Sequence, residues 1–189
     1  MGSAIHRIDP DTDILLRLQA GEDAALAILM DRHLQTITAI GFYMLSDMSL
    51  AEDVAQSTFL KLWEKAPEWV IGQATLLTWM RRVATNDCLS RLRKKRPIYS
   101  DTLPETPSTD SLASDNLEAQ DRAKAVQMAL QKLPDNQRAA ITLSYYQGVT
   151  QKEGAAIIGI GEKAYESLLS RARKKLKEML MPLKEETIL

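Results

Sequence analysis

The fold is decided by residues 133–180, which read LPDNQRAAITLSYYQGVTQKEGAAIIGIGEKAYESLLSRARKKLKEML. Their hydrophobic periodicity predicts three helices, at 136–147, 150–158 and 162–180. Thr150 and Glu153 have the spacing of a capping box, and Gly159-Ile160-Gly161 forms a short turn between the last two helices. Two helices joined in this way, the second with a basic end, are typical of a unit that lays one helix in the DNA major groove.

The helix at 162–180 is expected to have a buried side and a DNA-facing side. The buried side recurs every fourth residue, at Ala164, Leu168, Ala172, Leu176 and Leu180. On the other side, residues of the first turns are expected to contact base edges and later basic residues to contact phosphates. The predicted DNA contacts are Lys163, Glu166, Ser167, Ser170, Arg171, Arg173 and Lys174. The alternative is a solvated amphipathic helix.

The composition favours an all-α protein of the cytosol. Ala and Leu are frequent, aromatic residues make up 5% of the chain, and strand-like runs are missing. The net charge of −1 excludes a uniformly basic nucleic-acid binder, but basic residues gather at 91–96 and 171–177. Cys88 is the only cysteine, so no disulfide framework is possible. No signal peptide and no membrane span are predicted.

The first hundred residues predict four further helices, at 11–20, 22–45, from a capping box at Ser49 and Glu52 to before Pro67, and at 75–95. In the third of these, the expected core residues are Val54, Phe59, Leu62 and Trp63. Glu52, Asp53 and Gln56 lie on the opposite, polar face. His33 is expected to be solvated or structural, because no neighbour offers metal-ligand spacing.

The helix at 75–95 carries an apolar stripe formed by Leu77, Met80, Ala84, Cys88 and Leu92. A neighbouring face combines Trp79, Arg82 and Asn86, a mixture that suits unpaired nucleotides. Packing of Trp79 inside the core is the alternative. Trp69, in the preceding loop, is either a core residue or a base-stacking surface. The basic run at the helix end, which includes Arg91 and Arg93, is expected to contact phosphates.

Changes in composition divide the chain into five parts. We predict a flexible N-terminus at 1–10, a first helical domain at 11–96, an extended acidic linker at 97–115, a second domain with the helix-turn-helix at 116–182 and a tail at 183–189. The linker contains Pro, Ser, Thr and Asp without Lys or Arg. Its acids either serve solubility or let it lie in a positively charged channel of a partner.

The two halves together resemble an extracytoplasmic-function (ECF) sigma factor, the small two-domain promoter-recognition subunit of bacterial RNA polymerase. Residues 51–63, AEDVAQSTFLKLW, are similar to the polymerase-clamp-binding segment of that family, and residues 78–86, TWMRRVATN, to its promoter-melting segment. Residues 133–138, LPDNQR, and 167–176, SLLSRARKKL, resemble the start and the recognition helix of its second domain. Four motifs in this order and spacing are specific.

The resemblance implies a role for each half. Glu52, Asp53 and Gln56 would bind the polymerase clamp, and the loop at 66–75 with Trp79 and Asn86 would hold a flipped-out base of the −10 promoter element. The second domain would bind the polymerase flap and read the −35 element. Catalysis would belong to the polymerase, and an anti-sigma factor would hold the two domains inactive. No cofactor or metal is expected.

Three residues depart from the family pattern. Gly154 lies inside a helix where Ala is usual, which costs about 0.5–1 kcal/mol. Gly161 replaces the usual Ser or Thr cap, and Tyr165 stands where a smaller β-branched residue is common. These departures bear on the pose of the recognition helix.

Other classes of protein explain less of the chain. A stand-alone helix-turn-helix regulator would need a dimer interface, and no spare apolar helix offers one. An interaction module with vestigial DNA contacts is a third class. An enzyme is disfavoured because no nucleophile–base pair, metal cluster or phosphate loop is found.

Overall fold

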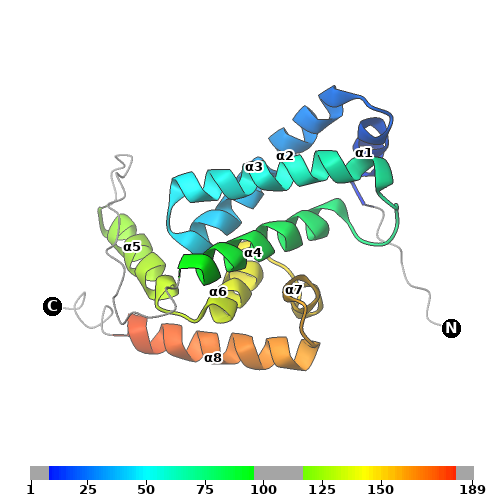
Figure 1. The fold of residues 1–189 in the computed structure, drawn as a ribbon. Helices are drawn as coiled ribbons and strands as arrows, with labels where there is room; N and C mark the ends of the chain where they lie inside the picture. Colours follow the sequence, from blue (N-terminus) through cyan, green and yellow to red (C-terminus); the bar gives the residue numbers. More distant parts are fainter. Residues whose placement is uncertain (1–8, 96–116, 182–189) are drawn as a thin grey trace.

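The computed structural model describes residues 9–95 and 117–181, and every regular element in these two segments is a helix (Figure 1). The first bundle contains α1 (Thr12–Gln19), α2 (Asp23–Leu45), α3 (Met48–Lys65), the 3-10 turn η1 (Ala66–Glu68) and α4 (Leu76–Lys95). The second contains α5 (Leu117–Gln131), α6 (Asp135–Ile141), the π-helical turn η2 (Thr142–Tyr146), α7 (Gln151–Ile158) and α8 (Glu162–Leu180). The predicted all-α class is confirmed. The predicted linker at 97–115 and tail at 183–189 lie outside the described residues.

The first bundle is built on α2, which packs against α1, α3 and α4. The backbones of α2 and α3 approach closely at Gly41, where an added Cβ would lie 2.6 Å from the Cα of Ala51. Large buried side chains fill the space between the helices, among them Leu29, Ile37, Ile40, Met44, Leu62, Leu76 and Met80. Cys88 is buried in this core, as predicted.

The structure corrects the predicted start of α3 and one of its core residues. The helix begins at Met48, and the carboxylate of Asp47 accepts a hydrogen bond from the Leu50 amide at 3.0 Å. Asp47 is therefore the N-cap, and the predicted capping box at Ser49 is wrong because Ser49 is already helical. Trp63 is half exposed instead of buried.

Asp9, within the predicted N-terminal segment 1–10, makes two hydrogen bonds to backbone amides. One carboxylate oxygen of Asp9 accepts from the Leu76 amide at 2.6 Å and the other from the Asp11 amide at 3.1 Å. Thr75 also caps α4, because the Thr78 amide donates to Thr75 Oγ1 at 3.3 Å. Asp9 therefore links the start of the described chain to the N-terminus of α4. A carboxylate is stabilised there by the amides that have no partner within the helix and by the helix dipole.

In the second bundle, the predicted capping box is present in full. Thr150 Oγ1 accepts from the Glu153 amide at 3.2 Å, and the Glu153 carboxylate accepts from the Thr150 amide at 3.0 Å. Gly159 ends α7 with a positive φ of 81°, which glycine adopts without strain. The helix predicted at 136–147 is α6 followed by a π-helical turn rather than one regular helix.

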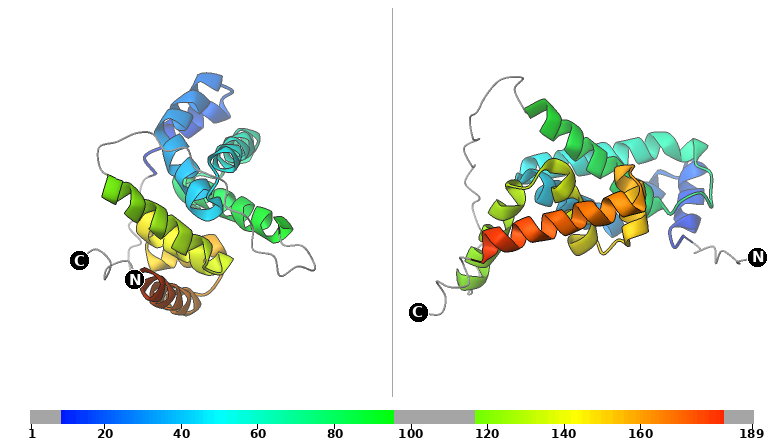
Figure 2. Two further views of the ribbon diagram at one scale, coloured as in Figure 1. Left: turned by 90° about the vertical axis from the view of Figure 1, so that its left-hand side faces the viewer. Right: turned by 90° about the horizontal axis from the view of Figure 1, so that it is seen from below.

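The second bundle packs against the C-terminal end of α2 (Figure 2). Gln127 Nε2 donates to the carbonyl oxygen of Phe42 at 2.9 Å, and Gln131 Nε2 donates to that of Tyr43 at 3.3 Å. The buried guanidinium of Arg138 donates to the carbonyl oxygen of Met44 at 2.6 Å. The last carbonyls of a helix have no partner within the helix. The Ser46 amide donates to that of Phe42, and the second bundle supplies donors to those of Tyr43 and Met44, so it completes the cap of α2.

Apolar contacts and two further hydrogen bonds complete the joint between the bundles. The rings of Tyr43 and Tyr146 stack with their centroids 3.6 Å apart. Ile158 of α7 packs against the cores of both bundles. Arg81 donates to the carbonyl oxygen of Gln147 at 2.9 Å, and the Gln147 side chain donates to that of Thr36 at 3.3 Å. In this arrangement, α8 lies on the side of the second bundle that faces away from α2 and α3 (Figures 1 and 2).

Replacing Gly41 by Ala should destabilise the first bundle, because the new methyl group would overlap the backbone of Ala51. Overpacking of this kind costs about 1–3 kcal/mol. The free energy of unfolding of the variant and of the wild type is measured by chemical denaturation. Gly161→Ala is the matched control, since nothing lies within 4 Å of its added Cβ. Equal stability of the two variants would contradict the close crossing of α2 and α3.

Candidate functional site

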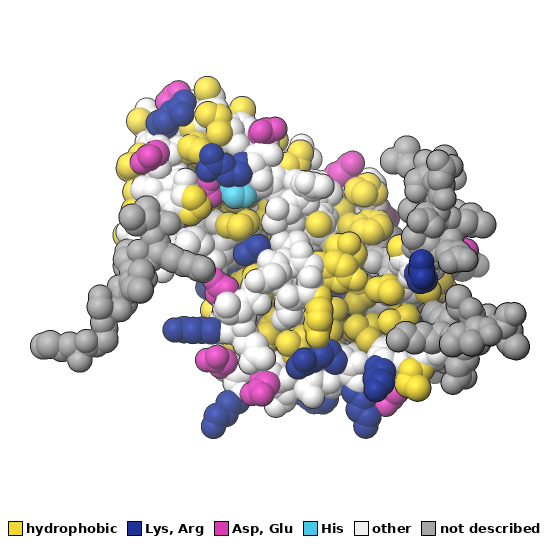
Figure 3. Space-filling model, turned by 180° about the vertical axis from the view of Figure 1, so that it is seen from behind, with side chains coloured by type: hydrophobic (Ala, Val, Ile, Leu, Met, Phe, Trp, Pro, Cys, Tyr) yellow, Lys and Arg dark blue, Asp and Glu magenta, His cyan; other side chains and the backbone are white. Residues whose placement is uncertain are grey.

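The exposed face of α8 is the first candidate site. Lys163, Glu166, Ser167, Ser170, Arg171, Arg173 and Lys174 are all exposed, as the sequence predicts. The Ser167 hydroxyl donates to the carbonyl oxygen of Lys163 at 2.9 Å, and Arg171 Nε donates to that of Ser167 at 3.3 Å. Basic side chains project along the lower edge of the molecule, where α8 runs (Figure 3).

The buried side of α8 differs from the prediction by one position. Tyr165, Leu169 and Ala172 are buried, Leu168, Leu176 and Leu180 are partly buried, and Ala164 is exposed. Arg173 stands apart from the other predicted DNA contacts. It lies at the edge of the exposed face, beside a small apolar pocket lined by Tyr145, Tyr146 and Leu176.

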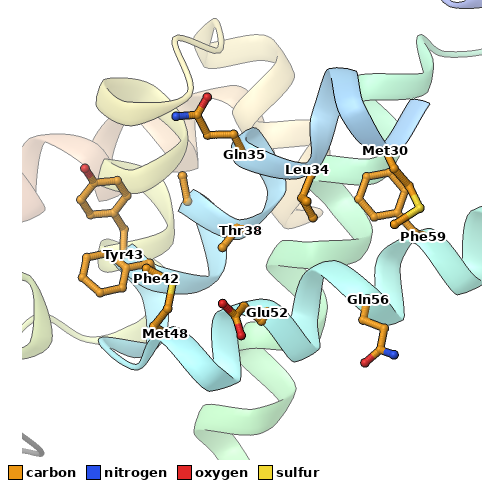
Figure 4. A pocket seen from close by; sticks show the side chains of 11 residues that line it. Met30, Leu34, Gln35, Thr38, Phe42, Tyr43, Met48, Glu52, Gln56 and Phe59 are labelled. Carbon is orange, nitrogen blue, oxygen red and sulfur yellow. The ribbon is translucent and has the colours of Figure 1, made fainter. Parts of the chain in front are cut away.

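A groove between α2 and α3 is the second candidate site (Figure 4). Its volume is about 620 Å³, and its lining is mostly apolar. The apolar residues come from α2 and α3 and include Met30, Leu34, Phe42, Met48 and Phe59. Two of the three predicted polymerase-binding residues, Glu52 and Gln56, also line it. An apolar groove with a carboxylate at its rim can bind an amphipathic helix that carries a basic residue.

The structure separates Asp53 from the other two polymerase-binding candidates. Its carboxylate pairs with Arg91 of α4 at 3.5 Å, and Arg91 Nε also contacts Asp87 at 3.2 Å. The hydrogen bond that Arg91 donates to Asp87 and the nearby carboxylates of Asp87 and Asp53 raise the pKa of Arg91. A phosphate contact by Arg91 would have to compete with these two acids.

The remaining −10 candidates lie on α4 and in the loop before it. Trp69 and Trp79 pack edge to face with their ring centroids 5.3 Å apart, and both are partly buried against the core of the first bundle. Arg82, Asn86 and Arg93 are exposed. The structure therefore brings the two tryptophans together and leaves a polar face on α4 beside them.

His33 is structural. Its Nε2 lies 2.8 Å from the buried carboxylate of Asp11, which Arg32 also contacts. Among the described residues, no group of His, Cys, Asp and Glu side chains could hold a metal ion. None of the described helices is both long enough and apolar enough to cross a bilayer.

Sequence analysis missed the apolar part of the groove. Met30, Leu34 and Met48 are each exposed to more than a third, although apolar side chains on a helix are usually expected in the core. Met30 and Leu34 are four residues apart, which places them on one side of the helix. A second apolar stripe on α2, beside the one that forms the core, was the signal available in the sequence.

Cys88 should resist thiol reagents in the folded protein. Burial raises the pKa of its thiol to about 12, so the reactive thiolate is scarce at neutral pH. Ellman's reagent at pH 8 should label Cys88 only after guanidinium is added. Rapid and complete labelling of the native chain would contradict the packing of α4.

Two segments of the chain match known protein families. Residues 29–98 match the family described as Sigma-70 region 2, and residues 123–176 match the family described as Sigma-70, region 4. The first match contains the groove and the α4 face, and the second contains α7 and most of α8.

Individual relatives are similar over nearly the whole chain. The ECF RNA polymerase sigma factor SigK of Mycobacterium tuberculosis is 28% identical over 180 residues, covering 92% of this chain and 96% of its own. The sigma factor RpoE of Bartonella quintana, solved with the anti-sigma factor NepR, has a TM-score of 0.62 and 26% identity, covering 82% and 96%. CnrH, solved with the cytosolic domain of CnrY, has the same fold, with a TM-score of 0.70 and 23% identity over 91% and 97%.

Proposed function

Because the chain is an ECF sigma factor, which directs RNA polymerase to promoters, we propose that its exposed surfaces divide this task. The groove between α2 and α3 binds the polymerase clamp, the α4 face binds the −10 element, and α8 reads the −35 element. The single observation that carries the proposal is the exposed polar face of α8, at the end of a helix-turn-helix with a complete capping box.

The groove supports the polymerase assignment by its chemistry. Its apolar floor would take the hydrophobic side of a clamp helix, and Glu52 would pair with a basic residue of that helix. Asp53, held by Arg91, has a different role in this proposal. It keeps the guanidinium of Arg91 near the −10 surface and links the two binding surfaces through one ion pair.

The α4 face supports the −10 assignment. Trp69 and Trp79 present a partly exposed aromatic corner, and exposed Arg82 and Asn86 stand next to it on α4. Aromatic surfaces stack on unpaired bases of any sequence, while a neighbouring amide and cation can select among them. The corner would receive a base of the opened strand.

An anti-sigma factor is the expected negative regulator. RpoE and CnrH, both similar to this chain, were solved as complexes with such a factor or with the cytosolic domain of CnrY. We propose that the regulator of this chain also covers the apolar groove. The chain acts in the cytoplasm, where polymerase and promoter DNA meet, and RNA synthesis remains the chemistry of the polymerase.

Glu52→Lys should lower the affinity for core polymerase by at least about tenfold, because it places a cation where a basic partner residue is expected. The affinity is measured by titrating labelled full-length chain with core enzyme. Asp23→Lys, an equal charge change at the exposed start of α2, is the control and should bind normally. Normal binding by Glu52→Lys would contradict the groove assignment.

Arg171→Ala should cost about 1–3 kcal/mol on the preferred −35 duplex and little on a scrambled one, if its guanidinium contacts a base. Lys175→Ala, also exposed on α8, should instead weaken both duplexes equally, as expected for a phosphate contact. Fluorescence anisotropy with the reconstituted holoenzyme measures both. Equal losses for Arg171→Ala on the two duplexes would reject base reading by this residue.

A further inference from the structure

Gly154 and Tyr165, two of the three residues expected to depart from the family pattern, meet in the structure. Gly154 lies in the middle of α7 and is buried. A Cβ added there would lie 2.3 Å from both the Cζ and the hydroxyl oxygen of Tyr165. The missing side chain of Gly154 is therefore the space that the Tyr165 ring occupies.

Tyr165 also fastens α8 to the end of α6. Its hydroxyl donates to the carbonyl oxygen of Ala140 at 3.1 Å and lies 2.8 Å from the hydroxyl of Ser144. Burial raises the pKa of Tyr165, so the phenol stays protonated and keeps its donor. The side chain of Tyr165 thus crosses the core of the second bundle. Its ring packs against Gly154 of α7, and its hydroxyl bonds to the backbone of α6.

The ring has no easy way to move aside. Tyr165 is completely buried, and its tip is held by two hydrogen bonds. A larger residue at position 154 would therefore push α7 and α8 apart or turn α8. A turn of about 10° moves the outer side chains of a helix by about 1 Å, since they lie about 5–6 Å from its axis. Paired hydrogen bonds to a base do not tolerate such a shift.

We propose that Gly154 and Tyr165 are a matched pair that sets the position of α8 on α6 and α7 and so aligns its DNA-reading residues. The inference rests on the proposed function of α8. Tyr165 is a positioning residue: it touches no DNA, but Glu166 and Ser167 follow it directly on the exposed face. A smaller side chain at position 165, such as that of Val, would leave the space at Gly154 unfilled.

A double-mutant cycle tests the pair. The variants are Gly154→Ala, Tyr165→Val and the two combined, with Ala156→Ser at an exposed position of the same helix as the matched control. Full-length chain is titrated with a duplex that the wild type selects from a random pool and with a scrambled duplex of the same composition. Thermal midpoints are recorded in parallel.

Gly154→Ala should lose at least about tenfold in affinity for the selected duplex, and the scrambled duplex should change by less than about twofold. The combined variant should bind the selected duplex more tightly than Gly154→Ala alone, because the smaller side chain makes room for the new methyl group. Ala156→Ser should behave like the wild type on both duplexes, because Ala156 is exposed on α7.

Two results would overturn the proposal. One is that Gly154→Ala keeps nearly the selectivity of the wild type, and the other is that the combined variant binds the selected duplex no more tightly than Gly154→Ala. Parallel losses on both duplexes that follow the thermal midpoint would show a role in stability alone and also overturn it. If the wild type selects no sequence, the proposed role of α8 fails and this inference fails with it. If the thermal midpoint of the combined variant then differed from the sum of the two single effects, the contact between residues 154 and 165 would be shown to exist without a role in DNA reading.

Discussion

The arrangement of the molecule depends on how the C-terminal end of α2 is capped. This helix has no basic residue in its last turn, and of its final carbonyls only that of Phe42 accepts from the C-cap amide of Ser46. Gln127 of the second bundle gives Phe42 a second donor, and Gln131 and Arg138 supply donors to the carbonyls of Tyr43 and Met44. Each donor lies on an element of the second bundle, so the hydrogen bonds that complete α2 also fasten the two bundles together.

This joint leaves the proposed binding surfaces accessible in different directions. The groove opens between α2 and α3, and α8 lies on the opposite side of the second bundle. Tyr43 belongs to both the groove and the joint, because it lines the groove and stacks on Tyr146. A helix bound in the groove would therefore touch a residue of the joint. Under the proposed function, binding of polymerase or of a regulator there would be linked to the position of the bundle that carries α8.

Local rules predicted much of the fold and part of the site. The order of the helices, the cap at Thr150 and the exposed face of α8 follow from periodicity and short-range spacing. The donors to α2 were not predictable, because a glutamine that bonds a distant carbonyl has the same pattern as a solvated one. The burial of Tyr165 was not predicted for a related reason. It depends on the space that Gly154 leaves on a neighbouring helix, and the hydrophobic periodicity of α8 contains no information about that space.

The most direct measurement is the distance between the bundles in the free chain. Because Cys88 is buried, cysteines introduced at exposed Lys61 of α3 and Lys177 of α8 can be labelled selectively for single-molecule energy transfer. If capping of α2 holds the bundles together, the full-length chain without any partner should show one narrow population of fixed transfer efficiency. A broad distribution of lower efficiency, as from two bundles moving independently, would contradict the account.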